Sequence, residues 1–195
     1  MISPEEILHL ARQRLGKKRL EHTCNVADMA VQLARRHGVE EQKARIAALL
    51  HDICKEEPPE TQLQRAEKFG IIFDDQQLAS PKVWHGFAAA EFAAGIGITD
   101  REILDAVCYH TTGRADMTPL DLVVFLADAV SAERDYPGVE ELRRLAFEDL
   151  EQAFFESIRA NMEELSHKGR PLIRDTWQAY NRYCPAASHK KEGRV

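Results

Sequence analysis

The sequence predicts an all-α protein made of one domain with eight to ten helices. Apolar residues recur three and four positions apart along most of the chain, several stretches begin with a capping residue followed by proline, and no segment shows the alternation of a strand. The length of 195 residues matches one ordinary domain, since single domains usually hold roughly 100–200 residues. A second full catalytic domain is therefore not expected.

The N-terminal part predicts three helices. Ser3-Pro4-Glu5-Glu6 is typical of a helix start, with serine as the N-cap, proline in the first turn and Glu6 closing a capping box, and an apolar stripe follows as far as Leu15. A second helix is expected from about Leu20 to His37, where Gly38 ends it. A third helix is expected over Glu40–Ile53.

Prolines and glycines divide the middle of the chain. Pro58-Pro59 ends one segment and opens the next helix, and residues 70–74 read as a loop. Ser80-Pro81 repeats the cap-plus-proline start before a helix over Lys82–Phe92, which the glycines of residues 95–98 end.

Two further helices follow. Thr99 or Asp100 caps a helix that reaches about Tyr109, and the Thr111-Thr112-Gly113 segment breaks it. Thr118-Pro119 then opens a helix that runs to Val130.

The C-terminal part begins with a turn at Pro137-Gly138. Helical periodicity then covers Val139–Leu165 and Leu172–Tyr183. We therefore expect one domain over residues 1–185, followed by a polar, weakly ordered tail over residues 186–195.

Charge and cysteine content exclude several classes of protein. The formal net charge of −6 argues against a broad basic surface for a nucleic-acid polymer. No apolar run reaches the ~20 residues of a membrane span, and the N-terminus lacks the pattern of a secretory signal. The four cysteines contain no CxxC pair, so we expect a cytoplasmic protein in which Cys24, Cys54 and Cys108 pack as small core residues.

Two acids interrupt apolar helix segments. Asp52 follows His51 within Leu49–Ile53, and Asp128 interrupts the apolar run Phe125–Val130. Burying an unpaired carboxylate costs several kcal/mol or more, so each needs a compensating partner. Imidazole and carboxylate are suitable ligands for iron, zinc or manganese, and the two acids with His51 therefore indicate a cation site.

Three more histidines are candidate ligands of this cation site because of their places in the sequence. His22 is expected in the first turn of its helix, His85 near a helix start, and His110 directly before the helix break at Thr111. Each alone is more often a structural or surface residue than a ligand. Asp128 alone could equally pair with an arginine such as Arg134.

The order of these residues along the chain changes that judgement. From residue 18 to residue 135 it resembles the signature of the HD-domain superfamily of metal-dependent phosphohydrolases. More closely, the chain is similar to the bacterial branch that hydrolyses diadenosine tetraphosphate symmetrically. The segments that carry this similarity are Arg19–Thr23, Leu50–Lys55, Val83–Gly86, Tyr109–Gly113, Ala127-Asp128 with Glu133–Tyr136, and Thr176–Asn181.

The resemblance implies a helical bundle of the HD type and cleavage of diadenosine tetraphosphate to two ADP by hydroxide bound to a metal. It implies that one divalent metal, expected to be iron, is held by four residues: His22, His51, Asp52 and Asp128. His85 and His110 either ligate a second metal that Asp52 bridges, or contact phosphate and protonate the leaving group.

Other residues are candidates for the substrate and for catalysis. Lys55 and Arg134 suit phosphate contacts, and Thr111 and Thr112 offer hydroxyl or backbone donors at the helix break. Asn25, one turn after His22, is a candidate nucleotide contact, and an ordinary surface amide is the alternative. The catalytic set is then Asp52, Lys55, His85 and His110.

Three other functions compete with this one. The first is hydrolysis of another nucleotide, either a guanosine alarmone or a deoxynucleotide. Alarmone hydrolases of the superfamily carry acids directly after the His-Asp pair, whereas here Ile53-Cys54-Lys55 separates the pair from the next acid, Glu56, which disfavours an alarmone. The same four histidines and two aspartates could hold a di-iron oxygenase centre. A sensor without turnover is disfavoured because the set of ligands is complete. The expected partner is a small nucleotide, and a homodimer is plausible by base rate alone.

Overall fold

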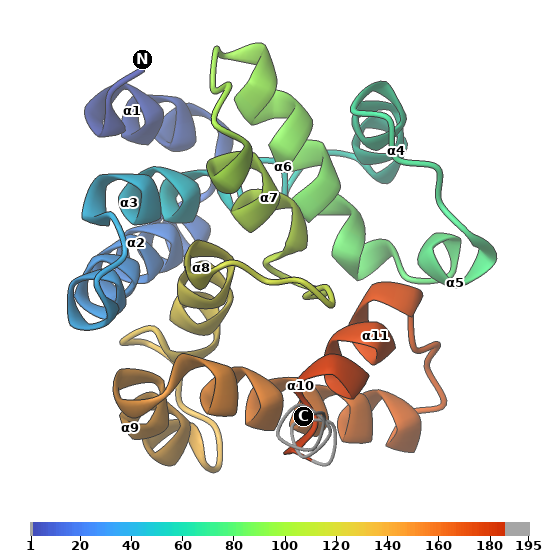
Figure 1. Cartoon of the computed structure of the whole chain (residues 1–195). Coiled ribbons are helices and arrows are strands. Elements are labelled where there is room, and N and C mark those ends of the chain that lie inside the picture. The colour runs from blue at the N-terminus through green and yellow to red at the C-terminus, as the bar shows by residue number, and fades with distance from the viewer. Residues whose placement is uncertain (1, 186–195) are drawn as a thin grey trace, which may run out of the picture.

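A computed structural model describes residues 2–185, and the tail expected over residues 186–195 lies outside this range. The described part contains eleven α-helices and one short 3₁₀ helix, and it contains no strand. The all-α fold class is confirmed (Figure 1). No helix in residues 2–185 combines the length and the apolar character that a bilayer crossing requires.

The first three helices are α1 (Pro4–Arg14), α2 (Lys17–His37) and α3 (Glu41–Leu50). The capping box at Ser3 forms as predicted, and Gly38 ends α2 with a positive φ of 70°. Helix α2 begins three residues earlier than expected, so His22 lies in its second turn.

The next four elements are α4 (Pro59–Lys68), α5 (Asp75–Leu78), η1 (Pro81–Val83) and α6 (Trp84–Gly95). Helix α5 was not expected. It forms because Asp74 caps the backbone N–H of Gln77, while the Gln77 side chain returns to the Asp74 backbone.

The remaining helices are α7 (Arg101–Tyr109), α8 (Pro119–Val130), α9 (Val139–Glu148), α10 (Leu150–His167) and α11 (Arg174–Tyr183). The single helix expected over Val139–Leu165 is wrong, because the chain breaks at Asp149. The backbone there is extended, and the Asp149 side chain accepts a hydrogen bond from the Gln152 N–H at the start of α10.

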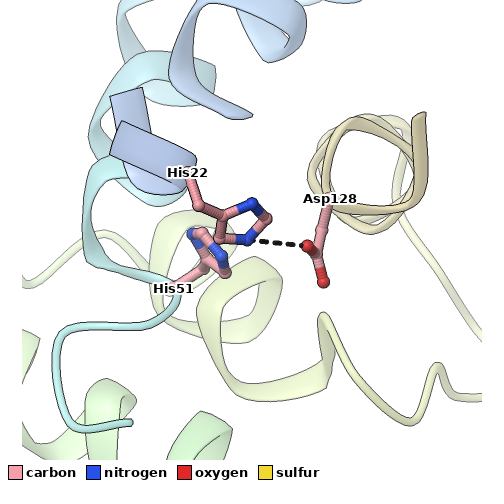
Figure 2. Close-up of side chains that lie close together, drawn as sticks. All are labelled: His22, His51 and Asp128. Carbon is pink, nitrogen blue, oxygen red and sulfur yellow. Dashed lines mark ion pairs between the residues drawn. The ribbon is translucent and has the colours of Figure 1, made fainter. Parts of the chain in front are cut away.

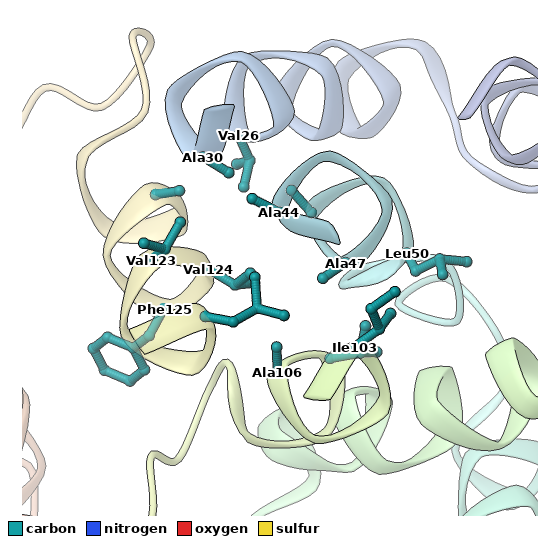
Figure 3. Packing of buried hydrophobic residues seen from close by; sticks show 14 of the residues in the cluster. Val26, Ala30, Ala44, Ala47, Leu50, Ile103, Ala106, Val123, Val124 and Phe125 are labelled. Carbon is teal, nitrogen blue, oxygen red and sulfur yellow. The ribbon is translucent and has the colours of Figure 1, made fainter. Parts of the chain in front are cut away.

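The core lies where α2, α3, α7 and α8 meet (Figure 3). Small residues on α2 and α3, among them Ala30, Ala44 and Ala47, allow these helices to approach closely, and Val124 of α8 fills the space beside them. Truncating a buried Leu such as Leu50 to Ala would cost about 2–5 kcal/mol of stability. This packing fixes the end of α3, where the His-Asp pair begins.

Candidate metal centre

Asp52 is the centre of the candidate site. It follows the end of α3 in a turn, and it is 3% exposed. Its Oδ1 atom lies 3.1 Å from His85 Nε2 and 3.9 Å from His110 Nε2. Its Oδ2 atom lies 3.5 Å from His51 Nε2 and 3.7 Å from His22 Nε2. One carboxylate therefore faces all four predicted histidines.

Asp128 completes the cluster from the opposite side. Figure 2 shows His22 of α2 and Asp128 of α8 pointing toward each other beside His51, with His22 Nε2 3.1 Å from Asp128 Oδ1. Arg134 contacts the same carboxylate, and its Nε donates to the Asp128 carbonyl over 2.8 Å. Asp128 thus faces both the histidine cluster and the arginine that the sequence offered as its alternative partner.

Hydrogen bonds orient the histidine rings toward a shared space. His51 Nδ1 lies 2.6 Å from the Ala48 carbonyl and His110 Nδ1 lies 2.7 Å from the Val107 carbonyl, so each Nδ1 carries the proton and each Nε2 offers a lone pair. The buried Nε2 atoms of His22 and His51 have no hydrogen-bond partner among the described residues. Unpartnered buried nitrogens that face carboxylates fit a cation.

Two triads of donor atoms have the spacing of metal ligands. His22, His51 and Asp128 form one, and His51, Asp52 and His110 form the other, with the donor atoms of each triad within 4.8 Å of one another. Nitrogen and carboxylate oxygen together suit borderline divalent metals. The residues of the site therefore fit a divalent metal ion.

The ionisation of the cluster favours a positive ion. Burial raises the pKa of Asp52, but His51 and His85 lower it more, so the pKa lies well below its usual value. The pKa of Asp128 is likewise lowered: burial raises it, but the contact with His22 and the charges of His51 and Arg134 together lower it more. Burial lowers the pKa of His110 to about 3, which leaves it neutral at physiological pH. Asp52 and Asp128 raise the pKa of His51 in spite of its burial, so the two carboxylates and His110 can bind a cation without first releasing protons, whereas His51 is favoured in its protonated form until a cation displaces the proton.

Gly86 sets the approach of α6 to α7 beside the site. A Cβ atom at this position would lie 2.8 Å from the Cys108 carbonyl oxygen and 3.3 Å from His110 Cε1. Only glycine allows this close approach, which brings His85 Nε2 within 3.0 Å of His110 Nε2.

A cavity of about 630 Å³ opens beside the cluster. Its lining residues are Lys18, Arg19, Glu21, His22, Glu56, Glu133, Arg134, Asp135 and Tyr136. A larger cavity of about 860 Å³ lies between α9 and α10, but none of the predicted site residues lines it. The smaller cavity is therefore the candidate substrate cavity, because it adjoins the His/Asp cluster and is lined by His22 and Arg134.

The candidate substrate residues lie in different surroundings. Lys55 Nζ lies 3.0 Å from His85 Nε2 and 3.9 Å from Asp52 Oδ1, and burial lowers its pKa. The Thr111 hydroxyl lies 3.2 Å from His110 Nε2. Thr112 is buried and donates its hydroxyl hydrogen to the Gly113 carbonyl. The Asn25 amide donates to Glu133 over 2.8 Å.

Two residues of the site, Arg19 and Glu133, were not predicted from the sequence to have a role. Arg19 Nη1 lies 2.7 Å from Asp52 Oδ2, and Glu133 contacts His22 Nδ1. Arg19 could have been found, because a residue three positions before His22 lies on the same helix face. Glu133 follows the end of α8, and no helical spacing predicts where such a residue points.

The fold and this site define the class of protein. The HD domain family model matches residues 19–133, more than half of the chain, and the chain belongs to this family. It is similar to proteins named bis(5'-nucleosyl)-tetraphosphatase, symmetrical. The one from Bacillus subtilis is 39% identical, with 91% of this chain and 95% of the relative covered. The one from Halalkalibacterium halodurans is 34% identical, with 89% and 93% covered.

A solved structure agrees with these relatives. The crystal structure of an HD superfamily hydrolase from Clostridium acetobutylicum superposes with a TM-score of 0.90 at 35% identity. The superposition covers 94% of this chain and 97% of that one. Membership of the HD family implies dependence on a divalent metal, and the His/Asp cluster is where such a metal fits.

Proposed function

We propose that this chain is a metal-dependent phosphohydrolase that cleaves diadenosine tetraphosphate symmetrically into two ADP. Relatives that carry the name of this activity match nearly the whole chain at 31–39% identity. The observation that carries the proposal is the placement of Asp52, whose two oxygens face four histidines beside a cavity whose lining includes Lys18, Arg19 and Arg134.

Four residues would hold the metal: His22, His51, Asp52 and Asp128. A divalent cation there lowers the pKa of a water that binds it from 15.7 toward ~7, which supplies a nucleophile at neutral pH. We propose iron as the metal, since the mixture of imidazole and carboxylate donors suits it. Metal analysis of protein purified without oxygen or chelators tests this identity.

Cationic side chains would hold the polyphosphate. Lys18, Arg19 and Arg134 line the cavity, and Lys55 lies at the His85 side of the cluster. Arginine pairs well with phosphate oxygens because its planar donors can bind two of them at once. Thr111 would add a hydroxyl donor. Thr112 and Asn25 stay candidate contacts: the Thr112 hydroxyl donates to the Gly113 carbonyl, and the Asn25 amide donates one of its two hydrogens to Glu133.

His85 is the proposed donor to the leaving phosphate. His110 Nδ1 donates to the Val107 carbonyl, so its Nε2 has no proton and can accept one hydrogen bond. The short contact between the two Nε2 atoms then assigns the proton to His85 Nε2, which also faces Asp52 Oδ1. Lys55 Nζ lies 3.2 Å from His85 Nδ1 and 3.0 Å from His85 Nε2, and in this tautomer only Nδ1 has a lone pair that can accept from the ammonium.

A second metal at Asp52, His85 and His110 is the alternative use of these residues. Asp52 and His110 belong to a triad with His51 whose donor atoms have the spacing of metal ligands. Two of the three residues of this second site are therefore already suitably placed. Binding there would require His85 to lose the proton at Nε2. Counting metal ions per chain therefore separates the two roles of His85.

Product analysis tests the proposed function. The metal-loaded protein is incubated with diadenosine tetraphosphate, and the nucleotides are separated by chromatography. We expect two ADP per substrate. ATP plus AMP would contradict symmetrical cleavage, and no product would contradict the substrate. Parallel incubations with a guanosine alarmone and with deoxynucleotides, and a measurement of oxygen consumption, test the competing functions.

We also propose that residues 1–185 form the catalytic domain and that the enzyme works as a homodimer in the cytoplasm. The four cysteines are free thiols, which suits a reducing compartment. The dimer is proposed because many soluble proteins form homodimers. Light scattering of the protein as it elutes from a gel-filtration column tests it.

A further inference from the structure

The carboxylate of Glu133 collects three hydrogen-bond donors. It contacts His22 Nδ1, it accepts from Asn25 Nδ2 over 2.8 Å, and it accepts from Ser131 Oγ over 2.8 Å. Its side chain is 34% exposed, while that of His22 is 9% exposed. Glu133 therefore closes the outer side of His22, and the opposite ring nitrogen faces Asp128 and Asp52.

His22 needs this partner because of its place in the fold. His51 and His110 each follow the last residue of a helix, where the carbonyl three residues earlier is free to accept from Nδ1. His22 lies inside α2, where the carbonyls of the preceding turn accept hydrogen bonds of the helix itself. The acceptor for His22 Nδ1 must then come from another element, and Glu133 supplies it from the segment after α8.

We propose that Glu133 is a positioning residue that holds the proton of His22 on Nδ1 and thereby keeps Nε2 free to bind the metal. This inference rests on the metal site of the proposed function. A carboxylate on the outer nitrogen fixes both the tautomer and the rotation of a metal-binding histidine. Ser131 and Asn25 in turn fix the carboxylate, so three residues outside the ligand set orient one ligand.

Histidine nitrogen NMR of the metal-free protein tests the tautomer directly. Spectra are recorded with a chelator present and at mildly alkaline pH, so that no metal enters the measurement. We expect the wild-type His22 signal to show a proton on Nδ1. In Glu133→Ala this signal should move to a mixture of both tautomers. An unchanged Nδ1 proton in Glu133→Ala would overturn the proposal.

Metal affinity, measured by competition with a chromophoric chelator, gives the second readout. Glu133→Ala should bind the metal about 10–100-fold more weakly than wild type. Glu133→Gln keeps an acceptor oxygen but loses the charge, so it should keep the tautomer and lose less affinity than Glu133→Ala. Asp135→Ala is the matched control, since Asp135 lines the same cavity and follows Glu133 by two residues. Equal affinities of wild type and Glu133→Ala would contradict the positioning role.

The outcomes separate this inference from the proposed function. If wild-type protein binds metal and cleaves the substrate while the Glu133 variants keep the wild-type tautomer and affinity, only the role of Glu133 fails. If wild-type protein binds no metal, the proposed function fails, and the tautomer of the metal-free protein still shows whether Glu133 orients His22. Circular dichroism of every variant confirms that the helices remain.

Discussion

The guanidinium of Arg19 lies against the carboxylate of Asp52, with Nη1 2.7 Å from Oδ2. Arg19 is partly exposed at the cavity, whereas Asp52 is buried. Arg19 thus contacts a buried acid of the cluster and also lies at the surface that a polyphosphate would meet.

Replacing Arg19 by Ala should weaken both substrate binding and catalysis. A hydrogen bond to a charged group contributes about 1.5–3 kcal/mol, which corresponds to a loss of roughly 10–100-fold in kcat/KM. Arg19→Lys should recover only part of this loss, because an ammonium cannot bind two oxygens as a planar fork. Steady-state kinetics measure the effect, with the exposed Arg36→Ala as control. Unchanged kcat/KM in Arg19→Ala would contradict a substrate contact.

Asp52→Ala should abolish metal retention and activity. This side chain faces all four histidines, so its removal takes a donor from the centre of the cluster. Metal content after gel filtration and product formation are the measurements, and circular dichroism should show similar helical content. Asp28→Ala is the control, because Asp28 is an exposed residue of α2 whose carboxylate pairs with Arg45. A fully active Asp52→Ala protein would overturn the site assignment.

Gly86→Ala should destabilise the protein and disturb the site. The added methyl group would meet a backbone oxygen that cannot move without α7, and such overpacking costs typically about 1–3 kcal/mol. Gly95→Ala, on the same helix, is the matched control, since its Cβ would meet no atom within 4 Å. There we expect a stability gain of about 0.5–1 kcal/mol from the better helix propensity of alanine. Urea unfolding measures both variants, and equal stabilities would contradict the close approach of α6 and α7.

Glu91 should make stability depend on pH. Burial raises the pKa of this carboxyl, but hydrogen bonds from Lys68 and Arg65 lower it more, so the pKa in the folded protein lies below the usual 4.5. The ion pairs therefore stabilise the fold fully above about pH 4.5, and this contribution is lost as pH falls through the lowered pKa.

Comparison with Glu91→Gln isolates that contribution. The difference in unfolding free energy between wild type and variant should be largest near neutral pH and should shrink as the solution becomes acidic. Chemical unfolding at a series of pH values measures it. The exposed Glu151→Gln serves as control. A difference that grows on acidification would show that the sign is wrong.

The sequence predicted the parts of the fold that depend on local rules. Capping residues such as Ser3 and Thr118 mark helix starts with their own side chains: Ser3 forms the expected capping box, and Thr118, expected to open a helix, forms one with Asp121. The break at Asp149 was missed because apolar residues continue with helical spacing on both sides of it. Helix α5 was missed because its four residues carry almost no periodicity.

Some residues of the candidate site could likewise be predicted from the sequence, and others could not. Asp52 and Asp128 could be singled out because an acid within an apolar stretch of sequence needs a partner, and the structure brings both to one cluster with His22 and His51. Glu133 could not be found, since its carboxylate reaches His22 across 111 positions of the chain. Tertiary packing alone decides which surface acid meets a buried histidine.

The positions of His51 and His110 directly after α3 and α7 have an electrostatic consequence. Both helices point their carboxyl ends at the cluster, and each such end carries roughly half a negative charge from the aligned peptide dipoles. That field attracts a positive ion and repels an anion. A phosphate chain that arrived before the metal would meet a negative electrostatic potential at the cluster. The metal should therefore bind first, and its positive charge should then favour binding of the nucleotide.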